Sequence, residues 1–298
     1  MPKHSRVMIA SLILLALGIT LPRLVAQETG YSLRFYGNGT DGIDRVKIVL
    51  DDPAATVNVG EDFTIEFWMM AAPDENNSGD CSSGADGWIT GNIILDRDVF
   101  GAGDYGDYGL SLFARDGVIA FGISDTDTGA TVCGSTSVND GAWHHIAVTR
   151  EHSTGIVTLF VDGTLDGSTI APTGDISYRR GRSTEWPNDA FLVIGAEKHD
   201  YDTTTYPSYS GWIDELRIST VIRYVDDFTP STEPFVNDDD TAALYHFDEG
   251  EGDSVEDASG NENAGQRYEG GVPPGPEWSD ETPFDAVDLP LETATPSS

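Results

Sequence analysis

Short segments in which apolar and polar residues alternate dominate the chain after residue 27, and helical periodicity is almost absent there. The clearest segment is 63–69, in which Phe63, Ile65, Phe67 and Met69 would share one face of a strand. Gly, Pro and Asp separate such segments at turn-like intervals. The pattern predicts an all-β fold, and a chain of this size is compatible with one large sandwich.

The other expected strands are equally short, and Asp162-Gly163 would close a hairpin between one of them and the segment that follows. These strands are expected at 31–35, 45–50, 92–96, 108–113, 118–123, 143–150, 156–161, 191–194 and 243–247. No internal repeat or linker divides them. We therefore expect a single folded unit.

The segment 211–218 constrains the site prediction most strongly. If it alternates as a regular strand, Asp214 shares a face with Trp212, Leu216 and Ile218. An ionised carboxylate in an apolar row is costly unless it is neutralised or hydrogen-bonded. Backbone N–H groups or a nearby Arg would satisfy it, and so would a bound Ca²⁺, which prefers oxygen ligands. Spacing alone does not decide between the two interpretations.

The chain begins with the pattern of a secretory signal peptide. Lys3 and Arg6 precede an apolar run that is shorter than a transmembrane helix requires, and small residues follow it. We expect residues 1–26 to be removed, 27–272 to form the folded domain, and the Pro-rich acidic tail 273–298 to be peripheral or disordered. No later segment is long and apolar enough to span a bilayer, so we expect a secreted, extracellular or periplasmic protein.

The chain is strongly acidic, with a formal charge of −35. Without the three basic residues of the signal, 13 basic residues face 51 acidic ones, a charge of −38. Such a surface repels nucleic acid and anionic lipid, and we exclude both as partners. Most of these carboxylates are expected to be solvated surface groups.

The two cysteines, Cys81 and Cys133, both lie in turn-rich segments. An even pair in an exported protein indicates a disulfide, whereas a cytosolic address would favour free thiols. Neither neighbourhood supplies the His or the basic cluster that activates a catalytic cysteine.

Several sequence segments resemble the laminin G-like jelly rolls of the concanavalin A-like lectin/glucanase superfamily. The matching segments occur in the order found in that family, at 62–68, 141–148, 159–163, 211–217, 244–250 and 257–261. Segments 43–48 and 195–200 are similar to those of exported bacterial proteins of this type. The resemblance implies a two-sheet antiparallel jelly-roll sandwich and often a structural Ca²⁺. It leaves the ligand open, because one fold carries many functions.

The resemblance also suggests ligands for that Ca²⁺. Bacterial laminarinases of the superfamily have a similar late strand whose Asp binds Ca²⁺ together with oxygens near the N-terminal strand. Asp214 matches that Asp, and Asn38 and Asp41 would be its partners.

No catalytic motif is found, and we predict that the protein is not an enzyme. Laminarinases carry Glu-x-Asp-x-Glu on one strand, and this chain has no such triplet. Asp96-Arg97-Asp98 has two carboxylates at strand spacing, but the intervening Arg suggests an ion pair. His144 and His145 would point to opposite faces of a strand and cannot line one site. A glycoside hydrolase with an unrecognised site is the alternative.

The expected function is non-catalytic recognition of a glycan or a cell-surface protein, with an adhesive envelope protein as a further alternative. Aromatic rings stack on sugars, and carboxylates and amides bind the hydroxyls. Tyrosines in Gly-, Asp- and Thr-rich stretches, together with a nearby charged run, form the predicted ligand surface: Tyr105, Tyr108, Tyr206, Tyr209, Glu197, Lys198, His199 and Asp200.

Overall fold

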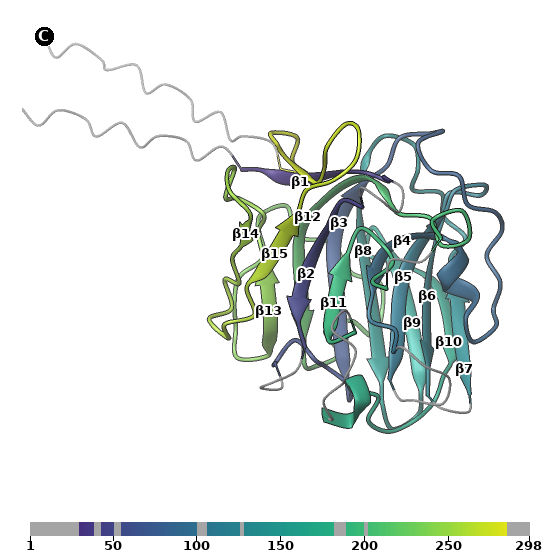
Figure 1. The fold of residues 1–298 in the computed structure, drawn as a ribbon. Coiled ribbons are helices and arrows are strands. Elements are labelled where there is room, and N and C mark those ends of the chain that lie inside the picture. The colour runs from purple at the N-terminus through teal and green to yellow at the C-terminus, as the bar shows by residue number, and fades with distance from the viewer. Residues whose placement is uncertain are drawn as a thin grey trace, which may run out of the picture.

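The computed structural model describes residues 30–38, 43–50, 55–99, 106–125, 128–181, 189–199 and 202–284. In this part of the chain, two antiparallel eight-stranded sheets pack face to face (Figure 1). The described residues contain no α-helix, only the short 3-10 segments Gly87–Thr90 (η2) and Tyr178–Gly181 (η3). The predicted all-β sandwich is confirmed.

Sheet A places β12 (Ser210–Ser219) at its centre, between β3 (Phe63–Met70) on one side and both β1 (Ser32–Tyr36) and β13 (Thr241–Tyr245) on the other. Its strands in spatial order are β10 (Thr164–Ile170), β9 (Ile156–Val161), β8 (Trp143–Glu151), β3 (Phe63–Met70), β12 (Ser210–Ser219), β1 (Ser32–Tyr36) and β16 (Glu277–Ser279), with β13 (Thr241–Tyr245) beside β12.

Sheet B places β11 and β4 at its centre. Its strands in spatial order are β14 (Ser254–Val255), β15 (Gly265–Tyr268), β2 (Arg45–Val49), β11 (Phe191–Ile194), β4 (Asn92–Asp96), β5 (Asp107–Phe113), β6 (Val118–Ser124) and β7 (Gly129–Cys133).

The apolar core lies between the two sheets, and β3 shows how alternation builds it. Phe63, Ile65, Phe67 and Met69 are buried in this core, as their spacing predicts. Every expected strand is present. The predicted hairpin also forms, because Asp162 and Gly163 adopt positive φ angles of 49° and 74° between β9 and β10.

Strands β7, β10, β14, β15 and β16 were not predicted individually, because their sequences are polar or rich in Gly. Among them, β16 lies in the segment expected to be peripheral, and it pairs with the edge of β1. Its Trp278 packs against the core. The sheet therefore extends into the predicted tail, while residues 285–298 lie outside the described part.

The predicted alternation of segment 211–218 is wrong in its middle. Glu215 has a φ of 51°, and the pairing of β12 with β3 slips at this point, which is a β-bulge. Ile213, Leu216 and Ile218 therefore face the core. Asp214 and Trp212 lie on the opposite, outer face of sheet A. Asp214 does not share an apolar row with Leu216, because the bulge inserts one residue between them.

The outer face of sheet A is covered by the segment 220–240. Glu66 of β3 points into this cover, where it accepts hydrogen bonds from Arg217 at 2.9 Å and Tyr224 at 2.7 Å. His145 of β8 is fully buried beside it, and Phe235 packs edge-on against the imidazole. His145 is thus a buried residue that packs against the segment covering sheet A.

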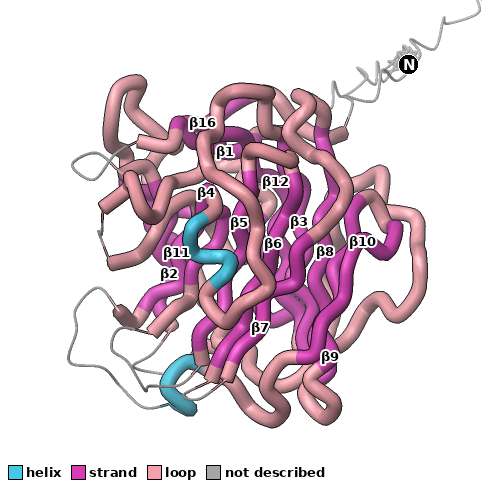
Figure 2. Tube along the Cα trace, turned by 90° about the vertical axis from the view of Figure 1, so that its right-hand side faces the viewer, coloured by secondary structure: helices cyan, strands magenta, loops and turns pink. Residues whose placement is uncertain are grey.

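The outer face of sheet B is partly covered by the loop 73–91, which includes η2 (Figure 2). Trp88 of this loop lies on β5 and β6, where two glycines make room for its ring. A Cβ at Gly122 would lie 1.9 Å from Cδ1 of Trp88, and one at Gly109 would lie 2.1 Å from its Cζ3. These glycines are required because the indole occupies the space that a side chain would fill.

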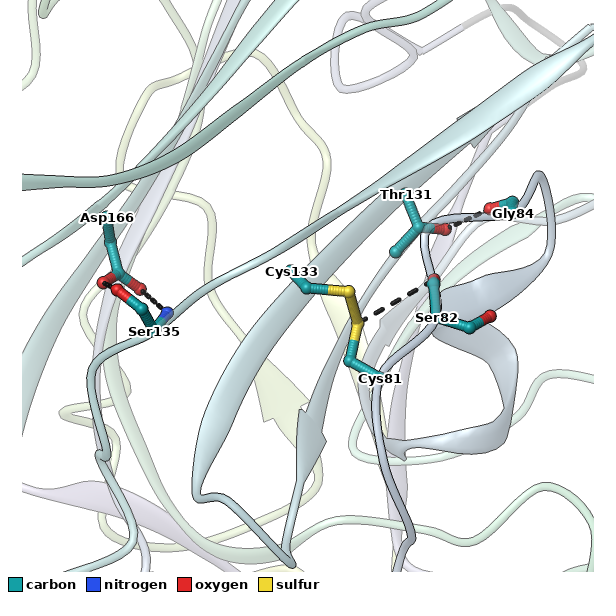
Figure 3. The surroundings of a disulfide bond; sticks show 7 residues. All are labelled: Cys81, Ser82, Gly84, Thr131, Cys133, Ser135 and Asp166. Atoms are coloured by element: carbon teal, nitrogen blue, oxygen red, sulfur yellow. Dashed lines mark hydrogen bonds between the residues drawn. A yellow bond between two sulfur atoms is a disulfide. The ribbon is translucent and has the colours of Figure 1, made fainter.

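A disulfide fastens this loop to the edge strand β7. Cys81 and Cys133 are bonded, with Cα atoms 6.0 Å apart, and Figure 3 shows the bond beside Thr131 of β7. Just after the end of β7, the main-chain N–H and the hydroxyl of Ser135 donate hydrogen bonds to Asp166 of β10, at 3.0 and 2.9 Å. The disulfide holds the loop on sheet B, and Asp166 links the edges of the two sheets.

The double variant Cys81→Ser/Cys133→Ser is expected to lower the free energy of unfolding by up to about 4 kcal/mol, because the bridge closes a long loop in the unfolded chain. Urea unfolding of the oxidised protein and the variant measures the difference. Reductant should destabilise the wild type and leave the variant unchanged. Equal free energies of unfolding would contradict this role for the bridge.

Candidate functional site

Two tyrosines that we expected in ligand-binding loops lie in the core instead. Tyr108 is in β5 and Tyr209 immediately precedes β12, and both side chains are fully buried. The hydroxyl of Tyr209 donates a hydrogen bond to the main-chain oxygen of Met70 at 2.9 Å. The guanidinium of Arg97 stacks on the ring of Tyr108 at 3.6 Å. Neither ring reaches solvent, so neither can stack on a sugar.

The remaining predicted tyrosines do not form an exposed cluster in the described residues. Tyr206 is partly buried and packs against the apolar group around Trp88. Tyr105 and Asp200 lie outside the described residues, as does the predicted metal ligand Asp41.

The predicted charged residues do come together, but in a buried position on the outer face of sheet B. Glu197, Lys198 and His199 follow β11 and meet carboxylates from the end of β4 and from just before β11. We call this group the ionic cluster: Asp96, Asp98, Asp189, Glu197, Lys198 and His199. The side chains of Lys198 and Asp189 are fully buried.

His199 is held between three carboxylates. Its Nδ1 lies 3.0 Å from Oε1 of Glu197 and 3.2 Å from Oδ1 of Asp98, and its Nε2 lies 3.0 Å from Oδ1 of Asp189. Burial disfavours the imidazolium, but the hydrogen bonds to Asp189 and Glu197 and the charge of Asp98 raise the pKa of His199 to about 10. Both ring nitrogens therefore carry protons at neutral pH and donate to carboxylates.

Lys198 and Arg179 neutralise the other side of the cluster. Nζ of Lys198 donates to the main-chain oxygen of Asp189 at 2.8 Å and lies 3.4 Å from its Oδ1. Oδ2 of Asp189 accepts hydrogen bonds from the hydroxyl of Tyr178 at 2.5 Å and from Arg179 at 2.7 Å. These contacts stabilise a carboxylate that would be costly to bury alone.

The cluster is rich in carboxylates that burial makes harder to ionise. Burial raises the pKa of Asp98 well above its ordinary value, and the charge of Asp96 raises it further. Asp96 accepts hydrogen bonds from the main-chain N–H groups of Asp98 and Lys198 at 2.8 and 3.0 Å. Nearby on β5, burial raises the pKa of Asp107 to about 6.

The ion pair that we expected within Asp96-Arg97-Asp98 does not form. Arg97 points to the opposite side of β4 and is fully buried, donating hydrogen bonds to the main-chain oxygens of Val59 and Ile176, both at 2.6 Å. Alternation along the strand separates it from its neighbours. Lys198 and His199, about 100 positions away in the sequence, compensate Asp98 instead.

Ligand atoms of Asp98, Glu197 and His199 lie within 4.8 Å of one another, which makes the cluster a candidate metal site. A metal requires a deprotonated imidazole, whereas carboxylates face both ring nitrogens of His199, and their hydrogen bonds raise its pKa. The cationic Lys198 lies 3.9 Å from Asp98. Ca²⁺ also prefers oxygen over imidazole nitrogen. The ionic cluster therefore does not fit Ca²⁺.

Asp214 fits a hard cation better. It is buried at a fork where β12 changes its partner from β1 to β13, and its Oδ1 accepts the main-chain N–H of Glu215 at 2.9 Å. Burial and the charges of Glu215 and Asp248 raise the pKa of Asp214 well above its ordinary value. Asp248 reaches the same fork, where it accepts the main-chain N–H of Tyr31 at 2.8 Å. A cation would relieve this repulsion.

The structure does not bring the predicted ligand Asn38 to Asp214. The register pairs Leu33 with Ile213 and Tyr36 with Ser210, so Asp214 and Asn38 lie beyond opposite ends of the paired segment of β1. The side-chain amide of Asn38 instead donates to the main-chain oxygen of Gly270 at 2.8 Å.

A polar cleft of about 630 Å³ opens at the rim of the sandwich, where the loop 73–91 meets residues 203–208. Its walls carry hydroxyl, amide and carboxylate groups from Glu75, Asn77, Thr90, Thr203, Thr204 and Thr205. We refer to it as the rim cleft.

Asn92, at the start of β4, holds the rim cleft together. Its Oδ1 accepts the main-chain N–H groups of Asn77 and Ser78 at 3.2 and 3.0 Å, and its Nδ2 donates to the main-chain oxygen of Ser208 at 2.8 Å. Arg34 of β1 fixes Glu75 in the wall at 2.8 Å. These bonds tie both walls to the sheets, so the cleft is largely preformed.

A family model of laminin G type, described as the concanavalin A-like lectin/glucanases superfamily, matches residues 40–226. The chain belongs to this superfamily. A search of curated proteins finds no match. Within the described residues, no helix has the length and apolar character needed to cross a membrane.

Solved structures with similar folds have low sequence identity to this superfamily member. A Bacteroides ovatus protein with a provisional carbohydrate-binding assignment shows 15% identity and a TM-score of 0.49 over 80% of this chain and 58% of its own. The CBM40 domain of the Ruminococcus gnavus IT-sialidase shows 14% identity and a TM-score of 0.41 over 63% and 92%. A heptameric pentraxin from Limulus polyphemus shows 12% identity and a TM-score of 0.44 over 66% and 78%.

Sequence analysis missed the rim cleft. The run Thr203-Thr204-Thr205 was visible next to Tyr206, but Asn77 and Glu75 lie more than 100 positions earlier, in a segment that showed only a polar loop. No local pattern brings these segments together. The side chain of Asn92 joins the two segments in the structure, but in the sequence Asn92 is an ordinary strand residue.

The contribution of His199 to the free energy of unfolding should decrease as the pH rises. Its pKa is about 10 in the folded protein against 6.5 when unperturbed, so its stabilising effect is complete below pH 6.5 and is lost as the pH rises towards 10. The difference in unfolding free energy between wild type and His199→Gln is expected to shrink by about 1.4 kcal/mol per pH unit from pH 7 to 9.5. Urea unfolding at several pH values measures it, and parallel profiles would contradict the assignment.

Proposed function

We propose that this protein is an exported, non-catalytic recognition module that binds a glycan of the cell surface or its surroundings through the rim cleft. The observation that carries the proposal is the chemistry of the cleft. The cleft is lined by Thr203, Thr204 and Thr205 from one segment and by Glu75 and Asn77 from another.

This set of groups suits a sugar. Sugar hydroxyls both donate and accept hydrogen bonds, and the cleft offers a carboxylate acceptor, an amide and several hydroxyls that do both. Its volume of about 630 Å³ lies in the range typical of small-ligand sites. The hydrogen bonds between the side chain of Asn92 and main-chain groups of both walls fix the cleft before a ligand arrives, which limits the entropy cost of binding.

Export is supported by the disulfide and by the predicted signal peptide, residues 1–26, which lies outside the described residues. Disulfides persist in oxidising compartments, outside the cell or in the periplasm. The Cys81–Cys133 bond belongs to the fold, because it holds the loop that supplies Glu75 and Asn77 to the cleft.

The absence of catalysis is supported by how the ionic cluster uses its carboxylates. Asp189 is bonded to Tyr178 and Arg179, Glu197 to His199, and Asp96 to main-chain N–H groups. Glycoside hydrolysis needs a carboxyl pair open to the scissile bond. Groups engaged in this way stabilise the sheet and do not form such a pair.

A structural Ca²⁺ at the fork of β12 is part of the proposal. Asp214 and Asp248 would supply carboxylate oxygens, and the ion would neutralise Asp214 and join β1, β12 and β13. Support comes from the burial of Asp214 and from its repulsion by Asp248.

The double variant Asn77→Ala/Thr204→Ala is expected to weaken glycan binding at least tenfold, or about 1.4 kcal/mol, through the loss of hydrogen bonds in the cleft. A glycan array followed by calorimetry with the strongest hit measures the loss. The main-chain bond from Asn77 to Asn92 is kept, so the fold should be retained.

Thr232→Ala, an exposed substitution in the segment 220–240, is the matched control and should bind as the wild type does. Incubation with labelled β-glucans tests for catalysis. An array without hits, or hydrolysis of the glucans, would contradict the proposed function.

The proposed Ca²⁺ should raise thermal stability in wild type and not in Asp214→Asn. At a free concentration 100 times the Kd, the gain is about 2.7 kcal/mol. Melting with Ca²⁺ and with EDTA measures it. Asp98→Asn is the control, because the ionic cluster does not fit Ca²⁺, and it should keep the response. A wild type that is insensitive to Ca²⁺ would contradict the proposed site.

A further inference from the structure

The lining of the rim cleft carries charge of only one sign. Among the described residues that line it, Glu75 is ionisable, and none is Lys, Arg, His or aromatic. The remaining polar side chains are amides and hydroxyls. A ligand in this cleft therefore meets a carboxylate, but neither a cation nor an aromatic ring belongs to the lining.

The described residues use only one of the two carboxylate oxygens of Glu75. Oε2 accepts a hydrogen bond from Arg34 at 2.8 Å and lies 3.4 Å from the hydroxyl of Ser210. Oε1 accepts no hydrogen bond from any described residue, and the side chain of Glu75 is 34% accessible. A bidentate ion pair would have occupied both oxygens. The pair with Arg34 therefore leaves Oε1 available to a donor that enters the cleft.

Arg34 positions Glu75 but is itself withheld from the cleft. Its guanidinium lies 4.6 Å from the ring centroid of Tyr36 and 4.1 Å from that of Trp212, within the range of a cation–π interaction. The residue is buried, and it is not part of the cleft lining. Arg34 therefore fixes the carboxylate in the wall without offering a cation that could bind an acidic sugar.

The threonine segment of the cleft also presents acceptors. The exposed Asp202 directly precedes it, and its carboxylate accepts the main-chain N–H of Thr204 at 3.0 Å and the hydroxyl of Thr205 at 3.2 Å. These hydrogen bonds, with those from Thr204 the strongest, lower the pKa of Asp202, so it is ionised at neutral pH. A hydroxyl that has donated its proton keeps its lone pairs as acceptors. Thr205 therefore favours a ligand that donates.

The charge of the whole protein has the same sign as the cleft. The chain carries 51 acidic residues against 16 basic ones. Its field attracts cations and repels anions. On a sugar, the group that suits such a site is an unsubstituted amine, because an ammonium offers three donors and no acceptor.

We propose that the rim cleft selects an amino sugar, such as a glucosamine residue with a free amino group, whose ammonium donates a hydrogen bond to Oε1 of Glu75. The hydroxyls of the sugar bind the amide and hydroxyl groups of the walls. Acidic sugars are disfavoured, because the only cation beside the cleft is buried and already paired. This inference rests on the proposed function, since it names the class of sugar that the same cleft takes.

Calorimetry of the protein at neutral pH with tetrasaccharides of glucosamine and of galactosamine tests the proposal. The matched probe is each tetrasaccharide after N-acetylation, which removes the positive charges and keeps the rings and linkages. At least one free amine is expected to bind about fivefold more tightly than its acetylated form, the effect of one partly exposed ion pair. That preference should fall when NaCl is raised from about 0.05 to 0.5 M, because salt screens exposed charges.

A matched pair of variants assigns the preference to one carboxylate. Glu75→Gln should remove the preference for the free amine, while its amide oxygen can still accept the hydrogen bond from Arg34. Glu233→Gln removes the same charge at an exposed position outside the cleft, so it is the control and should keep the preference. Thermal melting confirms that both variants are folded, and the salt series on the wild type does not depend on either of them.

The proposal is overturned if neither amino tetrasaccharide binds, if free and acetylated probes bind equally at low salt, or if a folded Glu75→Gln keeps the preference. Its failure is distinguishable from failure of the proposed function. If neutral glycans bind and Asn77→Ala/Thr204→Ala weakens that binding, the rim cleft is a glycan site that does not select amino sugars.

Discussion

Each of the two stacked sheets buries only one face in the shared core. How the outer face of each sheet is covered determines the rest of this structure. Sheet A has its outer face covered by the segment 220–240, which desolvates Glu66 and requires Arg217 and Tyr224 as its partners. Sheet B is covered by a disulfide-bound loop over one part and by the ionic cluster over the next. The same loop supplies one wall of the rim cleft.

The same constraint explains why so many charges of this acidic chain are buried. Carboxylates on a covered sheet face lose water, so each must be neutralised or protonated. Lys198, His199 and Arg179 provide this for Asp189 and its neighbours. Cationic side chains are thus used inside the fold, and Lys47 of β2 is itself buried. The kind of ligand that the protein can bind therefore depends on which charged side chains remain accessible.

Local sequence predicted most strands, because alternating apolar and polar residues are enough to identify a strand that buries one face, as in Phe63–Met70. It placed Asp214 on the wrong face, since Glu215 adopts a left-handed conformation without the Gly or Asn that usually signals one. It placed Tyr108 and Tyr209 at the surface because they lie in stretches rich in Gly, Asp and Thr, although their rings fill the core. It placed Glu197, Lys198 and His199 on a ligand surface, whereas the structure buries them in a cluster with Asp96, Asp98 and Asp189.

By itself, the sequence determined the all-β class, the spacing of the strands, the hairpin at Asp162-Gly163 and the pair of cysteines available for a bridge. These features depend on neighbouring residues, whose side chains alternate or turn according to local geometry. Only the tertiary structure decided which face Asp214 occupies, which carboxylates surround His199, and which side chains line the rim cleft. Those contacts join residues that are far apart in the sequence, and strand register, which no local pattern encodes, brings them together.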